Sequence, residues 1–237
     1  MDFGSSWFVI AFFIFVLAII PLFVVTAIPY CLGCLSEVII DSESFSYNDV
    51  PKNGSGNAGR ADFSSIFGRP LTFVVILCDI LTATLSVLAG VGAGYFSGGV
   101  SFLGDFGNNT EFAILLGKYW TAVFYLLGHM FPVMFGAKGG HILFGGIVAI
   151  VLDWRLALVV WGVFLILIAL TRYISLSAGF AAVAFPVGTW LFVSRSPVIM
   201  CLAVFLGGLV LWKHRGNIRR LLKGEESKLS FHKKETK

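Results

Sequence analysis

The chain has 237 residues, of which 57% are apolar and only 13% are charged, and its mean hydropathy is +0.90. Soluble domains carry about 25% charged residues, so this composition excludes an ordinary soluble domain. It predicts an all-helical, polytopic membrane protein that forms a single transmembrane domain over 1–237. Nine of the 17 basic residues follow Trp212, so the net charge of +4 describes a basic tail. Such a tail favours anionic lipid headgroups as partners and argues against nucleic acid.

Seven apolar runs are candidate membrane spans, because a helix needs about 20 apolar residues to cross about 30 Å of hydrocarbon. They lie at about 7–29, 71–96, 113–136, 141–152, 156–170, 174–193 and 197–212. The first run is too long for a cleaved signal peptide and no basic residue precedes it. The fourth and fifth runs are short. They indicate either a tilted helical hairpin around Asp153-Trp154-Arg155 or a re-entrant element, so a count of five or six spans stays open.

The orientation follows from the basic residues of the short loops, which accumulate on the cytoplasmic side of a membrane. If the N-terminus is outside, the inner pieces are a loop at about 31–70, turns near Lys138 and Arg172, and a tail at about 213–237. These pieces hold fourteen of the 17 Lys and Arg residues. The sequence therefore predicts an N-out, C-in bundle whose polar motifs gather at the cytoplasmic face.

The first polar cluster is a glycine-rich loop that precedes the second span. Its members are Gly54, Ser55, Gly56, Asn57, Ala58, Gly59 and Arg60. Glycine permits left-handed backbone and leaves amide N–H groups accessible, so such a loop can form a nest for an anion. Arg60 adds a guanidinium that binds phosphate through two hydrogen bonds. A flexible linker explains the same composition equally well.

The second cluster begins with the sequence GHMFPV from Gly128 and ends in Lys138-Gly139-Gly140. A cation beside two glycine amides offers the groups that capture phosphate. The alternative is a basic anchor at a flexible membrane turn. His129 lies in an apolar run, and we interpret it as a structural hydrogen-bonding residue rather than a catalyst.

The third cluster, residues 214–226, follows the last span. On a helix, His214 and Asn217 are three residues apart and share a face, whereas Arg215 and Arg219 project elsewhere. An imidazole and an amide that face inward below the membrane form a plausible orienting or proton-transferring pair. A basic juxtamembrane anchor is the alternative.

Isolated polar residues inside the spans carry weaker signals. Asp79 is the only carboxylate well inside a predicted span, so it marks either a functional site or a bond to a neighbouring helix. Cys31 and Cys34 form a CxxC pattern, but no second Cys or His pair stands at metal-site spacing. We interpret them as small apolar residues at a membrane boundary.

Taken in order, the three clusters resemble the motifs of the bacterial acyl-phosphate:glycerol-3-phosphate acyltransferase family, over about residues 54–226. HRGNIRRLLKGEE is similar to the family's His-Arg-x-Asn-Ile, Arg-Leu and later Gly-x-Glu, which places the glutamate at Glu226. GHMFPV with Lys-Gly-Gly resembles the middle motif. TRYISLS, from Thr171, resembles the family's turn between two late spans.

The resemblance implies a multi-pass enzyme of the bacterial cell membrane that transfers a fatty acyl group from acyl phosphate to glycerol 3-phosphate. The product is lysophosphatidic acid, in the first step of phospholipid synthesis. Acyl phosphate is a mixed anhydride with phosphate as its leaving group. The enzyme therefore has to hold two anions and align a hydroxyl with the carbonyl, and no acyl-enzyme, metal or dissociable cofactor is implied.

The resemblance also assigns roles to residues. The implied catalytic residues are Ser55, His214 and Asn217. The implied substrate-binding residues are Gly54, Gly56, Asn57, Gly59, Arg60, Lys138, Gly139 and Gly140. The implied structural residues are Asp79, His129 and Glu226. We expect Ser55, Lys138, His214 and Asn217 to converge in one pocket at the inner face.

Three positions depart from the family pattern. Ser65 stands where the family has an arginine, and Thr82 stands where a lysine follows the aspartate. His141 replaces a second lysine in the middle motif. We expect Arg60 to supply the guanidinium that the family has at the position of Ser65. Arg69 is the second candidate.

Two alternatives to this function stay open. The altered motifs favour a divergent paralogue that acylates another phosphorylated acceptor. A non-enzymatic lipid-binding or transport protein of the same fold is the other alternative, although a transporter is expected to place polar groups near the midplane and often to show internal repeats.

Overall fold

The computed structural model describes residues 22–35, 60–98, 110–133 and 144–226, and all regular elements in these ranges are helices. They are Leu22–Leu35, α2 (Arg60–Gly98), α3 (Thr110–Met130), α4 (Phe144–Leu152), α5 (Trp154–Thr171), α6 (Ile174–Phe192) and α7 (Pro197–Leu222). The predicted all-helical bundle of about seven helices is therefore confirmed.

Four segments of the described chain are long and apolar enough to cross a membrane. They are Ile76–Ser97 within α2, and the whole of α5, α6 and α7. The helix Leu22–Leu35 is apolar but shorter, and the part of the predicted first span before Leu22 lies outside the described residues.

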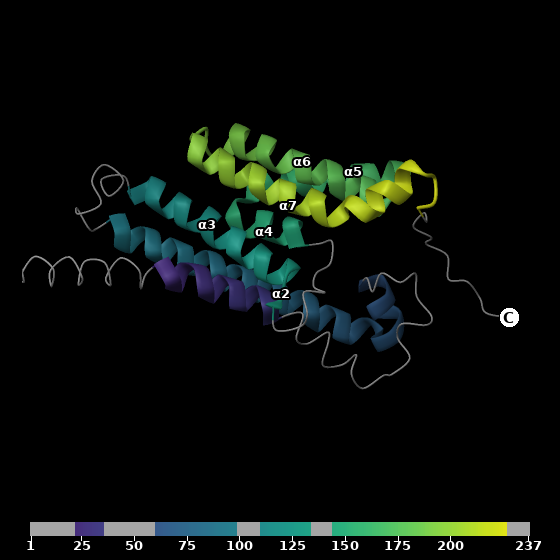
Figure 1. Cartoon of the computed structure of the whole chain (residues 1–237), viewed down its shortest axis with the longest axis horizontal. Helices are drawn as coiled ribbons and strands as arrows, with labels where there is room; N and C mark the ends of the chain where they lie inside the picture. Colours follow the sequence, from purple (N-terminus) through teal and green to yellow (C-terminus); the bar gives the residue numbers. More distant parts are fainter. Residues whose placement is uncertain (1–21, 36–59, 99–109, 134–143, 227–237) are drawn as a thin grey trace, which may run out of the picture.

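The helices form two groups with α4 between them (Figure 1). One group consists of Leu22–Leu35, α2 and α3, and the other of α5, α6 and α7. α2 packs chiefly on α3, and α6 packs on both α5 and α7. The two groups are joined because α3 contacts α7, and α4 contacts helices of both.

α3 is the helix on which the bundle is centred. Nine of its residues are buried, among them the polar Tyr119, Thr121 and His129. These side chains face neighbouring helices rather than lipid, because a polar group in hydrocarbon needs a partner from the protein. One such partner is Thr189 of α6, whose hydroxyl lies 3.0 Å from the Tyr119 hydroxyl.

Glycines set the distance between the helices of the first group. A Cβ atom added at Gly90 of α2 would overlap the backbone of Gly117 in α3, and the reverse is also true. Gly33 and Gly128 make the same close approach between Leu22–Leu35 and α3. Because lipid tails are as apolar as leucine, helices in a membrane associate through close packing of small residues rather than through the hydrophobic effect.

α4 and α5 form an antiparallel helical hairpin around Asp153, an arrangement that fits both the tilted hairpin and the re-entrant element that the sequence left open. Asp153 is extended and caps α5, because its Oδ1 accepts a hydrogen bond of 2.8 Å from the backbone N–H of Arg155. The Trp161 indole N–H of α5 donates to the Gly146 carbonyl of α4 over 3.1 Å. Partial burial raises the pKa of the Asp153 carboxyl, but the hydrogen bonds and charge of Arg155 outweigh this and hold the pKa below its ordinary value.

Two helices continue beyond the apolar runs that predict them. α2 begins at Arg60 and not near 71, and α7 ends at Leu222 and not near 212. Hydropathy marks only the part of a helix that lies in lipid, whereas the backbone hydrogen bonding of a helix continues into the headgroup region. Helices therefore occupy both ends of the stretch 31–70, and the third polar cluster lies on α7 as expected.

The glycine contact between α2 and α3 generates the first prediction. Gly90→Ala should destabilise the bundle, because the added methyl group overlaps backbone that cannot move without separating the helices. Overpacking of this kind costs about 1 to 3 kcal/mol, which lowers the Tm by roughly 2 to 12 °C. Thermal unfolding in detergent measures the effect. Gly92→Ala is the matched control, because nothing lies within 4 Å of the added atom; equal Tm values for the two variants would contradict the packing.

Candidate functional site

α7 carries the imidazole and the amide of the third cluster toward the interior. His214 is only 2% exposed, and Asn217 is half-buried, whereas Arg215 and Arg219 are exposed on the other face. The helical period of 3.6 residues produces this division. The structure therefore places His214 and Asn217 on the face that the spacing predicts.

Arg220, one turn after Asn217, links this pair to the end of the described chain. Its Nη2 donates to Asn217 Oδ1 over 2.9 Å, and its Nε donates to Glu226 Oε2 over 3.2 Å. The other carboxylate oxygen, Oε1, accepts a 2.5 Å hydrogen bond from the Ser175 hydroxyl of α6. Gly224, with φ of 72°, turns the chain so that Glu226 reaches α6. The four polar side chains thus form one connected network.

α7 is also fixed to the end of α3. The Lys213 ammonium group donates to the Met130 carbonyl over 3.5 Å, and the rings of Phe131 and Trp212 pack with centroids 5.3 Å apart. The Arg215 guanidinium covers the Trp212 ring at 3.8 Å from its centroid. The end of the GHMFPV motif and the residues that directly precede HRGN are therefore in contact.

Leu22–Leu35 holds the same end of α3 from its other side. The Tyr30 hydroxyl donates to the Phe131 carbonyl over 2.6 Å and accepts from the Val133 N–H over 3.2 Å. The Cys34 thiol donates to the Gly128 carbonyl over 3.3 Å. These bonds fix the backbone that leads toward Lys138, which itself lies outside the described residues.

His129 and Asp79 are both buried beside Tyr125 of α3. His129 Nδ1 lies 3.2 Å from the Gly33 carbonyl oxygen, and its ring stacks on Tyr125 at a centroid distance of 6.3 Å. The Tyr125 hydroxyl donates to the backbone carbonyl of Asp79 over 3.1 Å. These contacts join Leu22–Leu35, α2 and α3, and the structural roles of both residues stay a prediction.

Thr82 stands where the resemblance leads us to expect a lysine. Its hydroxyl donates to the Cys78 carbonyl of its own helix over 2.9 Å and lies 3.4 Å from the Tyr125 hydroxyl. The side chain is buried. A neutral hydroxyl that is bonded inside the bundle therefore stands at this position.

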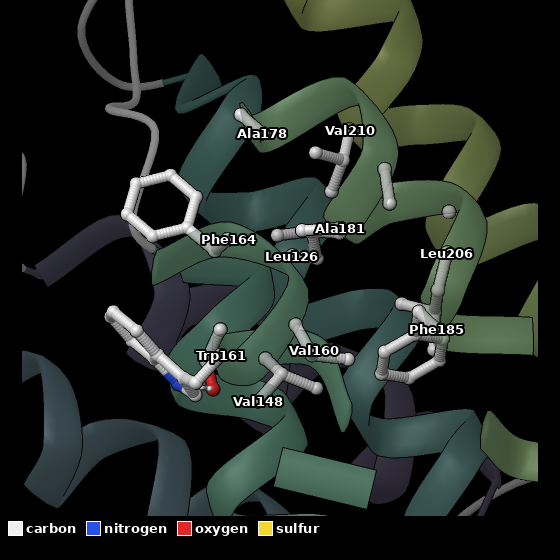
Figure 2. Close-up of a pocket in the computed structure, with 13 residues that line it drawn as sticks. Leu126, Val148, Val160, Trp161, Phe164, Ala178, Ala181, Phe185, Leu206 and Val210 are labelled. Carbon is white, nitrogen blue, oxygen red and sulfur yellow. Dashed lines mark hydrogen bonds between the residues drawn. The ribbon is translucent and has the colours of Figure 1, made fainter. Parts of the chain in front are cut away.

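An apolar cavity of about 50 Å³ lies between α3, α4, α5, α6 and α7 (Figure 2). Its lining residues are all apolar or aromatic: Leu126, Gly146, Val148, Val160, Trp161, Phe164, Ala178, Ala181, Ala182, Phe185, Leu206, Gly207 and Val210. Val210 precedes His214 by about one helical turn, and Ala178 follows Ser175 by about one turn. Part of the cavity lining therefore lies about one helical turn, roughly 5 Å along the helix, from His214 and Ser175.

Part of the predicted site lies outside the described residues. This holds for Gly54, Ser55, Gly56, Asn57, Gly59, Lys138, Gly139 and Gly140. The predicted convergence of Ser55 and Lys138 with His214 and Asn217 consequently stays a prediction. Arg60 is the first residue of α2. In the described ranges, no group of three His, Cys, Asp or Glu side chains is arranged to hold a metal ion.

The structure adds residues that the sequence did not single out as site residues. Ser175 falls in TRYISLS and Arg220 in RRLL, so both stand within stretches that the resemblance covers. Their pairing through Glu226 carries no sequence signal, because it depends on how α6 and α7 align. Tyr30 is a single polar residue in an apolar run and carries no signal either.

The apolar helices of the bundle define an integral membrane protein, and its candidate site is the polar network at one end of α6 and α7. A family model for glycerol-3-phosphate acyltransferase matches residues 22–224. The glycerol-3-phosphate acyltransferase of Pseudoalteromonas translucida is 34% identical over 211 residues, which cover 87% of this chain and 92% of that protein. The enzyme of the same description from Vibrio campbellii is 33% identical over 214 residues, 89% of this chain and 94% of that protein.

Solved structures agree with the sequence relatives. PlsY, an integral membrane glycerol 3-phosphate acyltransferase, has been crystallised in a glycerol 3-phosphate form. This form matches 89% of this chain and 96% of its own, with a TM-score of 0.68 and 27% identity. The lysophosphatidic acid form matches with a TM-score of 0.64 and 28% identity. The chain belongs to the glycerol-3-phosphate acyltransferase family, so the predicted family is confirmed, and it is an acyltransferase.

The Tyr30 contacts generate the second prediction. Tyr30→Phe removes one hydroxyl that both donates and accepts, so it should free the backbone at Phe131 and Val133 and cost about 1 to 3 kcal/mol of stability. Hydrogen exchange read by mass spectrometry should show faster exchange in the peptide that covers these residues. Tyr95→Phe is the control, because that side chain is exposed. Unchanged exchange in the Tyr30 variant would mean that the hydroxyl does not hold this segment.

Proposed function

We propose that this acyltransferase uses acyl phosphate as donor and glycerol 3-phosphate as acceptor, and that it releases lysophosphatidic acid and inorganic phosphate. The observation that carries the proposal is the arrangement of α7. The helix presents His214 and Asn217 on the same inward face as Val210, which lines the apolar cavity. In this proposal the phosphate head meets the polar network and the fatty tail follows the apolar residues of α6 and α7 beside it, since a cavity of about 50 Å³ is itself too small to hold an acyl chain.

The chemistry of the step fits the polar groups available. An acceptor hydroxyl of glycerol 3-phosphate attacks the acyl carbonyl, the bond from the acyl carbon to the phosphate oxygen breaks, and the hydroxyl proton leaves. His214 accepts or relays that proton, and Asn217 orients the reacting oxygens. Phosphate departs with the electron pair of the broken bond, so no covalent enzyme intermediate is needed.

Two anionic substrates require several cationic or N–H donors. The glycine loop with Ser55 and Arg60, and the Lys138 segment with its two glycines, supply these groups in the proposal. Arg60 begins α2, and the positive end of a helix dipole favours an anion at that position. Arg69 lies about 14 Å further along the same helix, at 1.5 Å per residue.

The site faces the cytoplasm of a bacterial cell in this proposal, with the chain N-out and C-in. Beyond Trp212, Arg215 and Arg219 of α7 and its C-cap residue Lys223 are exposed. Cations that follow an aromatic residue at the end of a membrane span are typical of the cytoplasmic headgroup layer, where anionic lipids attract them. Glycerol 3-phosphate, a water-soluble metabolite, reaches the site from that side.

A second function is favoured by one specific observation. The neutral Thr82 hydroxyl in place of the family's lysine, together with Ser65 in place of its arginine, reduces the positive charge of the region. A divergent acyltransferase with another phosphorylated acceptor would fit this loss. Competition between glycerol 3-phosphate and other phosphorylated polyols in the same assay separates the two functions.

The assay of the main proposal is direct. Purified protein, palmitoyl phosphate and glycerol 3-phosphate should give lysophosphatidic acid without coenzyme A or acyl carrier protein. His214→Ala should lower kcat by about 10²- to 10⁴-fold, the usual contribution of general acid–base catalysis. Palmitoyl coenzyme A replaces the acyl phosphate in the control reaction. Product from the thioester alone would overturn the proposed donor.

A further prediction concerns Arg60, which we propose replaces the arginine that the family has at the position of Ser65. Arg60→Ala should raise the KM for glycerol 3-phosphate by about 10- to 100-fold. This follows because a charge-assisted hydrogen bond contributes about 1.5 to 3 kcal/mol and each 1.4 kcal/mol is a factor of ten. Arg69→Ala is the matched control and should change the KM little. Unchanged kinetics in the Arg60 variant would show that this guanidinium does not bind the acceptor.

A further inference from the structure

Arg220 is not among the residues to which the motifs assign a role, yet it contacts the amide of Asn217. We infer that Arg220 is a positioning residue, which fixes the Asn217 side chain so that its amide nitrogen donates to a substrate oxygen. The inference rests on the proposed function, because it names how one residue of that site works. It concerns the direction of a hydrogen bond and therefore the chemical role of Asn217.

The contact between the two side chains settles which end of the amide faces the guanidinium. Arginine has only N–H donors, so the Asn217 atom that lies 2.9 Å from Arg220 Nη2 must be the carbonyl oxygen. The oxygen and nitrogen of a carboxamide point to different sides of the same planar group. With the oxygen held by Arg220, the N–H donors of Asn217 are turned away from the guanidinium.

The Arg220 guanidinium is also bonded to the carboxylate of Glu226. Arg220 Nε donates to Glu226 Oε2 over 3.2 Å, and Glu226 Oε1 accepts a 2.5 Å bond from Ser175. The Ser175 side chain is buried at the start of α6, and the Glu226 side chain is only 11% exposed. The fixed fork of a guanidinium keeps two acceptors in one geometry, which a lysine ammonium does not do. Each member of the series therefore restricts the next, from α6 to the amide of Asn217.

This orientation suits the charges of the proposed reaction. Phosphate oxygens and the acyl carbonyl oxygen accept hydrogen bonds, and the carbonyl oxygen gains negative charge in the transition state. A preorganised N–H donor stabilises such an oxygen without reorganising during the reaction. Asn217 then acts as a donor and not as a proton acceptor, and His214, one turn earlier on the same face, is left as the group that takes the proton.

Arg220→Ala tests the positioning role, with Arg219→Ala as the matched control. Arg219 is the preceding residue; it is exposed and projects from α7 on the side away from Asn217. The Arg220 side chain is 42% exposed, so the ion pair adds little to stability and the variant should keep a near-normal Tm. We expect kcat to fall about 10-fold or more in Arg220→Ala, against at most about twofold in Arg219→Ala. Equal effects of the two substitutions would overturn the inference.

If Arg220 acted only through its positive charge, kcat of its variants would change differently. Arg220→Lys keeps the positive charge but loses the planar fork, so it should still lower kcat, whereas an electrostatic role predicts normal kcat. A double-mutant cycle with Asn217→Ala separates the two roles further. If Arg220 acts through Asn217, the double variant should match Asn217→Ala within about twofold. Independent, multiplying losses would contradict the positioning role.

Asn217→Asp tests the direction of the hydrogen bond. An aspartate retains an oxygen for Arg220 but has no N–H donor, and its charge repels substrate phosphate. We therefore expect the aspartate variant to be less active than Asn217→Ala, which should lose about 100-fold in kcat as oxyanion donors do. An aspartate variant that is more active than the alanine variant would show that position 217 works as an acceptor.

A measurement without turnover keeps the inference separate from the proposed function. In protein labelled with ¹⁵N-asparagine, the side-chain amide of Asn217 should relax as a rigid group, and it is assigned by its loss in Asn217→Asp. Arg220→Ala should make that amide mobile and Arg219→Ala should not. A rigid amide in Arg220→Ala overturns the inference. Failure of the wild-type protein to form lysophosphatidic acid counts against the proposed function alone.

Discussion

The structure depends on the close approach of helix backbones in lipid. Inside a bilayer, the hydrophobic effect does not drive helices together, so the contact at Gly90 and Gly117 sets how α2 and α3 associate. Gly33 and Gly128 bring Leu22–Leu35 equally close. At this distance α3 can bury tyrosine, threonine and histidine side chains against its neighbours, and each finds a polar partner from the protein. The polar side chains that lie within the otherwise apolar core are tolerated because of the same constraint.

The site is built where this rigid first group meets the second group of helices. The end of α3 is held by Tyr30 on one side and by Lys213 on the other. α7 then extends past the membrane-embedded part and presents His214 and Asn217 inward, while the cations on its other face remain exposed. The chain reverses direction at Gly224, so Glu226 reaches α6 and accepts a hydrogen bond from Ser175. Residues that line an apolar cavity consequently lie about one helical turn from His214 and from Ser175 of the polar network, on the same two helices.

Much of this arrangement could be predicted from periodicity and composition. The helical period places His214 and Asn217 on one face whatever the rest of the fold, and Asp153 predicts a break between two short helices. The full lengths of α2 and α7 could not be predicted, because hydropathy reports only the lipid-embedded part of a helix. The bond from Ser175 to Glu226 could not be predicted either, since it requires the register of α6 on α7 and the reversal at Gly224. Those features depend on tertiary packing, and no local pattern encodes them.

The central claim is that acyl transfer from acyl phosphate to glycerol 3-phosphate takes place beside His214 and Asn217. Phosphorus NMR follows donor, acceptor and both products in one sample. The account predicts that one inorganic phosphate appears for each lysophosphatidic acid formed, and that both signals are almost absent in the His214→Ala and Asn217→Ala proteins. Release of phosphate without formation of lysophosphatidic acid, or equal rates in the two variants and the wild type, would contradict it.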